Sequence, residues 1–95
     1  MIEITHANGN ITITGHAGYA EHGKDIVCSG VSALVQTLIV AIPELTTDII
    51  QYDIQPGWAN IKHGILSERA QLLIDSFFLG LKMIADEYPQ CVRLV

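Results

Sequence analysis

Hydrophobic and polar residues alternate at the start of the chain. Ile2 and Ile4 alternate with polar neighbours, and Ile11 and Ile13 do the same after the dipeptide Asn8-Gly9. A period of two is typical of half-buried strands, and Asn-Gly favours a tight hairpin turn because both turn positions need positive φ. The pattern therefore predicts two antiparallel strands joined by that turn.

A long apolar segment follows, with no charged residue from Ile26 to Pro43. Its apolar residues recur every three or four positions, which is typical of a helix. Asp25 and Ser29 are both good N-caps, so we expect the helix to start between them and to stop at Pro43. The segment is near the length of a membrane span, but polar residues interrupt it and proline ends it. A buried central helix is the better interpretation.

The second half of the chain repeats both patterns. Alternation on either side of Pro56-Gly57 predicts a second hairpin, and Ser67 precedes a second helical pattern that ends near Tyr88-Pro89. Residues 92–94 can add a short last strand. The order ββαββα, with that possible last strand, predicts an α+β fold, in which two helices pack on one face of a mostly antiparallel sheet.

Composition limits the classes of protein that fit. The chain has 95 residues, room for a single domain over residues 1–95. Hydrophobic residues are 49% and charged residues 16%, which excludes disorder and favours a homodimer, because a small monomer cannot bury that much apolar surface. The net charge of −5 argues against nucleic acid. No secretory signal is evident, so we expect a cytoplasmic protein, not bound to a membrane, with free thiols at Cys28 and Cys91.

The glycine-rich segment between the first hairpin and the first helix carries the candidate chemistry. His16 lies where the strand pattern stops, and Cys28 lies where the helical pattern begins. A short loop can bring a strand end and a helix start together, and a histidine within reach of a cysteine activates it as a nucleophile. The start of a helix also favours a thiolate. The main-chain N–H groups of Cys28 and Ser29 would then hold the oxyanion formed when the thiolate attacks a carbonyl.

Other residues of this segment are candidates for supporting roles. Asp25 either orients the imidazole or caps the helix. Ser32 lies one turn after Cys28 and can hydrogen-bond the sulfur. The residues between His16 and Cys28 have no apolar period and predict a mobile loop that closes over a bound peptide. This substrate-gating loop comprises Ala17, Gly18, Tyr19, Ala20, Glu21, His22, Gly23 and Lys24.

Structural roles are the alternative for several of these residues. A lone cysteine is usually a small buried hydrophobe, which is our interpretation of Cys91, while composition alone does not decide for Cys28. His16, His22 and Cys28 fit no zinc spacing and lack an evident fourth ligand. The loop glycines form no dinucleotide-binding fingerprint. We therefore expect neither a metal nor another cofactor.

The motif Gly15-His16-Ala17, Gly23, Asp25-Ile26-Val27-Cys28 and Ser32 resembles the signature of the bacterial ribosomal-processing cysteine protease family, Prp. The resemblance covers essentially the whole chain, including Glu87-Tyr88. It implies a catalytic dyad of His16 and Cys28, and a homodimer with a flexible loop over the site. It also implies removal of a short N-terminal extension from the precursor of a large-subunit ribosomal protein, after an aromatic residue. Ser29-Gly30 departs from the small apolar residues common there.

Two alternatives to this function remain at the level of sequence. One is a non-enzymatic dimeric protein that binds the same kind of peptide, and the other is a phage-derived relative that processes a phage structural protein. The presence of both His16 and Cys28 favours the enzyme, because a binding protein would be free to lose either. Redox sensing by Cys28 is less favoured because no resolving cysteine lies nearby.

Overall fold

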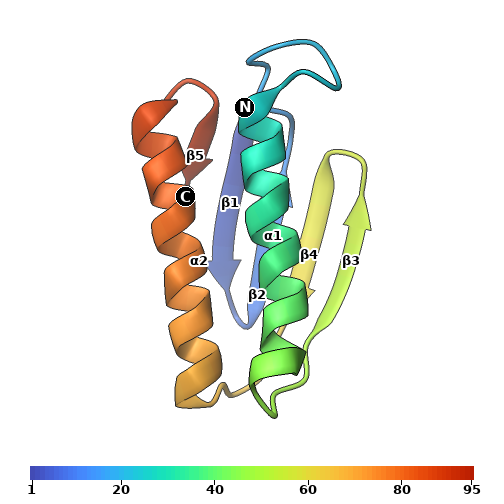
Figure 1. Ribbon diagram of the computed structural model, residues 1–95, viewed down its shortest axis with the longest axis vertical. Helices are drawn as coiled ribbons and strands as arrows, with labels where there is room; N and C mark the ends of the chain where they lie inside the picture. The colour runs from blue at the N-terminus through green and yellow to red at the C-terminus, as the bar shows by residue number, and fades with distance from the viewer.

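The computed structural model describes residues 1–95 as a five-stranded sheet with two helices on one face (Figure 1). In chain order the elements are β1 (Ile2–Ala7), β2 (Asn10–Thr14), α1 (Ile26–Leu45), β3 (Gln51–Gln55), β4 (Trp58–Lys62), α2 (Glu68–Glu87) and β5 (Val92–Leu94). The strand order is β3-β4-β2-β1-β5, with β1 and β5 parallel and all other neighbours antiparallel. The predicted α+β class is confirmed.

The first hairpin forms as its sequence predicts. Asn8 and Gly9 both have positive φ, of 53° and 74°, and Ala7 pairs with Asn10 across the turn. The alternation then directs Ile2, Ile4, Ile11 and Ile13 to the face that the helices cover, where all four are buried.

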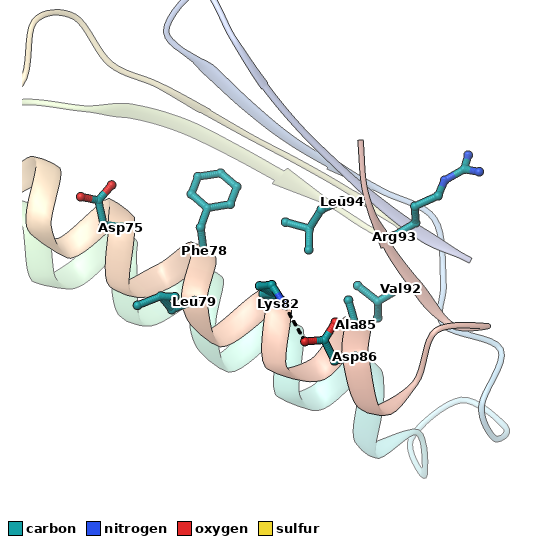
Figure 2. Close-up of a pocket in the computed structure, with 9 residues that line it drawn as sticks. All are labelled: Asp75, Phe78, Leu79, Lys82, Ala85, Asp86, Val92, Arg93 and Leu94. Carbon is teal, nitrogen blue, oxygen red and sulfur yellow. Dashed lines mark hydrogen bonds and ion pairs between the residues drawn. The ribbon is translucent and has the colours of Figure 1, made fainter.

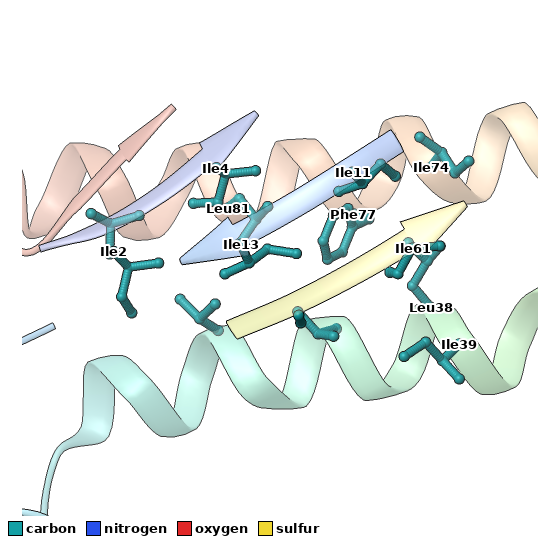
Figure 3. Packing of buried hydrophobic residues seen from close by; sticks show 14 of the residues in the cluster. Ile2, Ile4, Ile11, Ile13, Leu38, Ile39, Ile61, Ile74, Phe77 and Leu81 are labelled. Atoms are coloured by element: carbon teal, nitrogen blue, oxygen red, sulfur yellow. The ribbon is translucent and has the colours of Figure 1, made fainter. Parts of the chain in front are cut away.

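The core lies between that face and the two helices (Figure 3). Isoleucines supply most of the sheet side, and Ile4, Ile11 and Ile61 are at most 1% exposed. The buried side chains of α1 recur at helical spacing and are Val27, Val31, Val35, Leu38, Ile39 and Ile42. Those of α2 are Ala70, Ile74, Phe77 and Leu81. Because the apolar stripes of both helices are buried against the sheet, the start of α1 lies at the end of the sheet where β2 ends.

The prediction that the first helix stops at Pro43 is wrong, because α1 continues to Leu45. Pro43 lies in the last turn, where its missing N–H costs one intrahelical bond. The end of the helix is held instead by Thr46, whose main-chain N–H and hydroxyl both donate to the Ile42 carbonyl, at 3.0 and 2.6 Å. By length and composition α1 would suit a membrane span, and in this fold it packs along the sheet.

Strand β3 extends beyond the area that the helices cover (Figure 1). Tyr52 and Ile54 are paired with Ile61 and Ala59, both buried on the core face. They nevertheless remain 58% and 46% exposed. The alternation correctly predicted the strand, but its apolar side is not buried within a single chain.

Candidate active site

Cys28 lies in the first turn of α1, and Asp25 is the N-cap of that helix. One carboxylate oxygen of Asp25, Oδ1, accepts the main-chain N–H groups of Val27 and Cys28, each at 3.0 Å. These bonds satisfy two of the donors that a helix start leaves unpaired. The cap fixes the half-buried Cys28 at the end of the helix nearest the loop.

The second oxygen of Asp25, Oδ2, holds the loop. It accepts the main-chain N–H of Tyr19 at 3.0 Å and that of Ala20 at 3.3 Å. These four N–H groups, that of Cys28 foremost, hold the pKa of the Asp25 carboxyl below its usual value, against the opposing effect of burial. Asp25 therefore caps the helix and does not orient the imidazole. It also binds the main chain of the loop. Asp25 makes no hydrogen bond to His16.

The donors expected for the oxyanion are already engaged in this conformation. The N–H of Cys28 donates to the Asp25 side chain, and the N–H of Ser29 donates to the Asp25 carbonyl at 3.0 Å. The N–H that points to the Cys28 sulfur is instead that of Ala17, at 3.3 Å. Our assignment of the oxyanion donors is therefore wrong for this conformation, because capping takes precedence in the first helical turn.

Ser29 and Ser32 are both exposed and line a cavity together with Cys28. The predicted hydrogen bond from Ser32 to the sulfur does not form. A contribution of either serine to a bound peptide stays a prediction.

His16 lies two residues after the end of β2 and is held through its neighbours. Its carbonyl accepts the amino group of Met1 at 2.5 Å, and the N–H of Gly15 donates to the carbonyl of Gly57 at 2.8 Å. The imidazole lies against the β3–β4 turn, where a Cβ atom added to Gly57 would be only 2.7 Å from Nε2. No hydrogen bond joins the imidazole to the Cys28 sulfur. The sequence did not reveal Gly57 as a neighbour of His16, because that contact follows from the pairing of β2 with β4.

His16 and Cys28 line two adjoining cavities. One, of about 290 Å³, is bounded by Val35 of α1 and by Ile54 and Trp58 of the second hairpin. The other, of about 540 Å³, lies under the loop and is lined mostly by polar residues. Because the two share His16 and Cys28, an extended chain crossing from one to the other passes both side chains.

A larger hollow lies elsewhere, between α2 and β5 (Figure 2). It measures about 720 Å³ and contains the exposed pair of Lys82 and Asp86, 2.7 Å apart, but neither cysteine nor histidine. Its size alone therefore does not make it a candidate active site.

The first half of the loop from Ala17 to Lys24 makes more contacts with the rest of the protein than its second half. Ala17 is 4% exposed, and the ring of Tyr19 packs edge-to-face on Tyr88 with centroids 5.3 Å apart. Beyond Ala20, the contacts join Glu21 and Lys24: an exposed ion pair at 3.3 Å and a hydrogen bond from the Lys24 N–H to the Glu21 carbonyl at 3.0 Å. The expectation that few contacts hold the loop therefore fits residues 21–24, and its first half is held by Asp25 and Tyr88.

The remaining histidines and Cys91 lie outside this site, apart from His22, which lines both cavities. His6 and His63 form a hydrogen-bonded pair at 2.9 Å between their Nε2 atoms, and the His6 ring stacks on Phe78. Both cysteines are free thiols. No three histidine, cysteine or acidic side chains are grouped so that they could hold a metal ion.

Comparison with known proteins shows the family of this chain. The family model described as cysteine protease Prp matches residues 1–93. The chain belongs to the Prp family. Among its relatives is the ribosomal processing cysteine protease Prp of Staphylococcus aureus, 34% identical over 88 aligned positions that cover 90% of this chain and 83% of that protein. The Bacillus subtilis Prp is 29% identical over 102 residues, covering 98% and 91% of the two chains.

Solved Prp structures share the fold. The S. aureus Prp in complex with a covalently linked product peptide has a TM-score of 0.88 at 29% identity, over 98% of this chain and 94% of that chain. The same protease with a substrate peptide has a TM-score of 0.82 at 28% identity, over 99% and 95% of the chains. Like the other Prp proteins, this chain is a cysteine protease.

Proposed function

We propose that Cys28 is the nucleophile of this protease and that His16 is its general base and acid. The observation that carries the proposal is that both side chains line the same two cavities at the capped start of α1. Cys91 lies after α2 and lines neither of these cavities.

The mechanism follows the chemistry of a cysteine nucleophile. His16 takes the thiol proton, and the thiolate attacks the peptide carbonyl carbon to form a tetrahedral oxyanion. The Ala17 N–H, which donates to the sulfur at 3.3 Å in the free protein, would then donate to that oxyanion. Collapse breaks the C–N bond as the imidazolium gives its proton to the leaving amine. His16 then deprotonates a water that hydrolyses the thioester and restores the thiol.

We further propose that the substrate is the N-terminal extension of a ribosomal protein precursor. The names of the relatives, which describe ribosomal processing, and the peptide complexes of the S. aureus protein support this assignment. The apolar cavity beside Trp58 and Ile54 suits a large apolar side chain next to the cleaved bond. Processing of a phage structural protein is the alternative substrate class.

We also propose a cytoplasmic homodimer. The support is the uncovered core face of β3, where Tyr52 and Ile54 are exposed, together with apolar residues that are exposed elsewhere on the surface, such as Val40 of α1, which is 61% exposed. A second copy packed there would cover the apolar surface that the single chain leaves open. Because Ile54 also lines the active-site cavity, the partner would lie close to the bound peptide.

Incubation with a purified ribosomal protein precursor tests the function. The expected result is one cleavage in the extension, found by mass spectrometry of the intact product, with turnover reduced at least about a thousand-fold in Cys28→Ala and in His16→Ala. Cys91→Ala is the matched control and should cleave normally. Cleavage of a phage structural protein with the ribosomal precursor left intact would refute the substrate assignment, and an active Cys28→Ala would refute the nucleophile.

A further inference from the structure

Gly57, in the turn between β3 and β4, lies directly beneath the imidazole of His16. A Cβ atom at this position would be 2.7 Å from Nε2, 3.2 Å from Cε1 and 3.5 Å from Cδ2. The first distance is shorter than any ordinary contact of a Cβ atom, so a side chain at residue 57 and the ring in its present position exclude one another. Gly57 also has φ of +72°, which only glycine adopts without strain.

The turn and the histidine segment are parts of one rigid unit. Thr14 pairs with Trp58, and the N–H of Gly15 donates to the Gly57 carbonyl at 2.8 Å. The position of Gly57 relative to the His16 backbone is therefore set by strand pairing and does not depend on the loop from Ala17 to Lys24.

The ring in this position is not engaged with the nucleophile. Nε2 is the ring atom nearest to the site of that added Cβ, and the Cys28 sulfur has the Ala17 N–H as its hydrogen-bond partner. Pro56, Gly57 and Trp58 line the cavity that also contains the sulfur. A peptide that fills this cavity therefore contacts the turn, the imidazole and the thiol together.

We propose that Gly57 is a positioning residue: its missing side chain gives His16 a resting position against the turn, apart from the thiol, and a bound peptide moves the ring toward the sulfur. The inference rests on the proposed dyad of His16 and Cys28. Its consequence is that the thiol of the free protein reacts without help from His16, whereas turnover of the peptide requires His16. Unproductive reactions of the thiol are thereby limited until substrate is bound.

Alkylation of the free protein by iodoacetamide at pH 7 measures this separation. In the wild type, His16→Ala should change the alkylation rate of Cys28 less than about two-fold, although it abolishes peptide turnover. In Gly57→Ala the resting position is filled and the ring is pushed into the cavity, so alkylation should rise at least about three-fold. The double variant Gly57→Ala/His16→Ala should lose that increase.

Gly57→Ala could act through backbone strain or through contact with the His16 ring, and a residue of opposite chirality distinguishes the two causes. A D-alanine at residue 57, introduced by chemical synthesis, accepts positive φ and carries its methyl group on the opposite side of Cα. We expect it to behave as the wild type. Gly64→Ala is a simpler control, because an added Cβ there meets no atom within 4 Å and the backbone is not left-handed.

The possible results distinguish the inference from the proposed function. If His16→Ala slows alkylation of the free wild-type protein as strongly as it slows turnover, the resting position does not exist. The same holds if L-alanine and D-alanine at residue 57 have equal effects, or if Gly57→Ala alkylates at the wild-type rate. If His16→Ala retains peptide turnover, the dyad itself is wrong. The first comparison needs no Gly57 variant and so remains decisive even if Gly57→Ala does not fold.

Discussion

The main-chain N–H of Ala17 donates to the sulfur of Cys28 at 3.3 Å, so the residue after His16 touches the candidate nucleophile. The loop thus turns back onto the helix start immediately after the histidine, and Ala17 itself is buried. Ala17 and Cys28, which are eleven positions apart in the sequence, are therefore in contact. No hydrogen bond from the His16 ring to the thiol is needed to hold them together. It also leaves the ring free to move while the backbone on either side stays fixed.

Replacing Asp25 with asparagine should loosen both the helix start and the loop. Asparagine has a single acceptor oxygen, whereas Asp25 uses two oxygens to accept four N–H groups. We expect the thermal midpoint at pH 7 to fall by several degrees, together with a lower kcat. Asp86→Asn, which removes only an exposed ion pair with Lys82, is the matched control and should change neither quantity.

The same carboxylate should contribute to acid sensitivity. Its pKa is lower in the folded protein, chiefly through the hydrogen bond from the Cys28 N–H, so on acidification the unfolded chain takes up this proton first. Its stabilisation is present above the ordinary aspartate pKa of about 3.9 and is lost as the pH falls below it. Circular dichroism melts at pH 7 and pH 3 should show a smaller acid-induced loss in Asp25→Asn than in the wild type. An equal loss would contradict this account.

A second pH effect should come from the pair of His6 and His63. Burial, and then the charge of His63, lower the pKa of His6, whose ring also packs on Phe78. The unfolded chain then takes up the proton first, so stability should decrease as the pH falls from about 7 through the ordinary histidine pKa of about 6.5. His6→Asn should flatten the dependence of the urea midpoint on pH over this range. His22→Asn, in the exposed part of the loop, should leave it as in the wild type.

The proposed dimer should depend on the core face of β3. Tyr52 is 58% exposed there, and a glutamate in its place would put a charge into the interface. Sedimentation at micromolar concentration should give twice the chain mass for the wild type, and Tyr52→Glu should weaken the dimer at least about ten-fold. Leu79→Glu, which alters an equally exposed apolar residue on α2, should remain dimeric. A wild-type monomer, or a dimer sensitive only to Leu79→Glu, would disprove this interface.

Local sequence patterns were sufficient to predict the helices and strands and the position of Cys28 at the start of a helix. Alternation, the Asn8-Gly9 turn and the Asp25 and Ser67 caps all depend on neighbouring residues, and the structure contains each of them. The position of Cys28 in the first turn of α1 follows from the same local rules. What the patterns could not give was any contact that depends on how strands of different hairpins pair.

Two features that the local patterns do not predict are of that kind. Gly57 lies against His16 because β2 pairs with β4, and Tyr52 is exposed because β3 is at the sheet edge. The engagement of the Cys28 N–H was missed for a different reason. The sequence offers Asp25 and Ser29 as alternative caps, and Asp25, the cap in the structure, takes up the Cys28 N–H that the sequence suggests as an oxyanion donor.

Residues 21–24 are the half of the loop that we expect to close over a bound peptide. Gly23 has φ of +86° and open space around it, so proline there changes the conformation of residues 21–24 without a steric clash at the added Cβ position. If this half closes over the peptide, Gly23→Pro should lower kcat at least about ten-fold while Cys28 is still alkylated at the wild-type rate. Gly64→Ala should have no effect on turnover. Normal turnover by Gly23→Pro would show that the segment is only a connection.

If Cys28 is the nucleophile, it carries the acyl group of the cleaved peptide until water releases it. Reactions with a ribosomal protein precursor can be quenched in acid within the first turnover, digested, and mapped by mass spectrometry. We expect a thioester on the fragment containing Cys28, none on the fragment containing Cys91, and no adduct in Cys28→Ala. An acyl group on any other residue, or cleavage by Cys28→Ala at the wild-type rate, would contradict it.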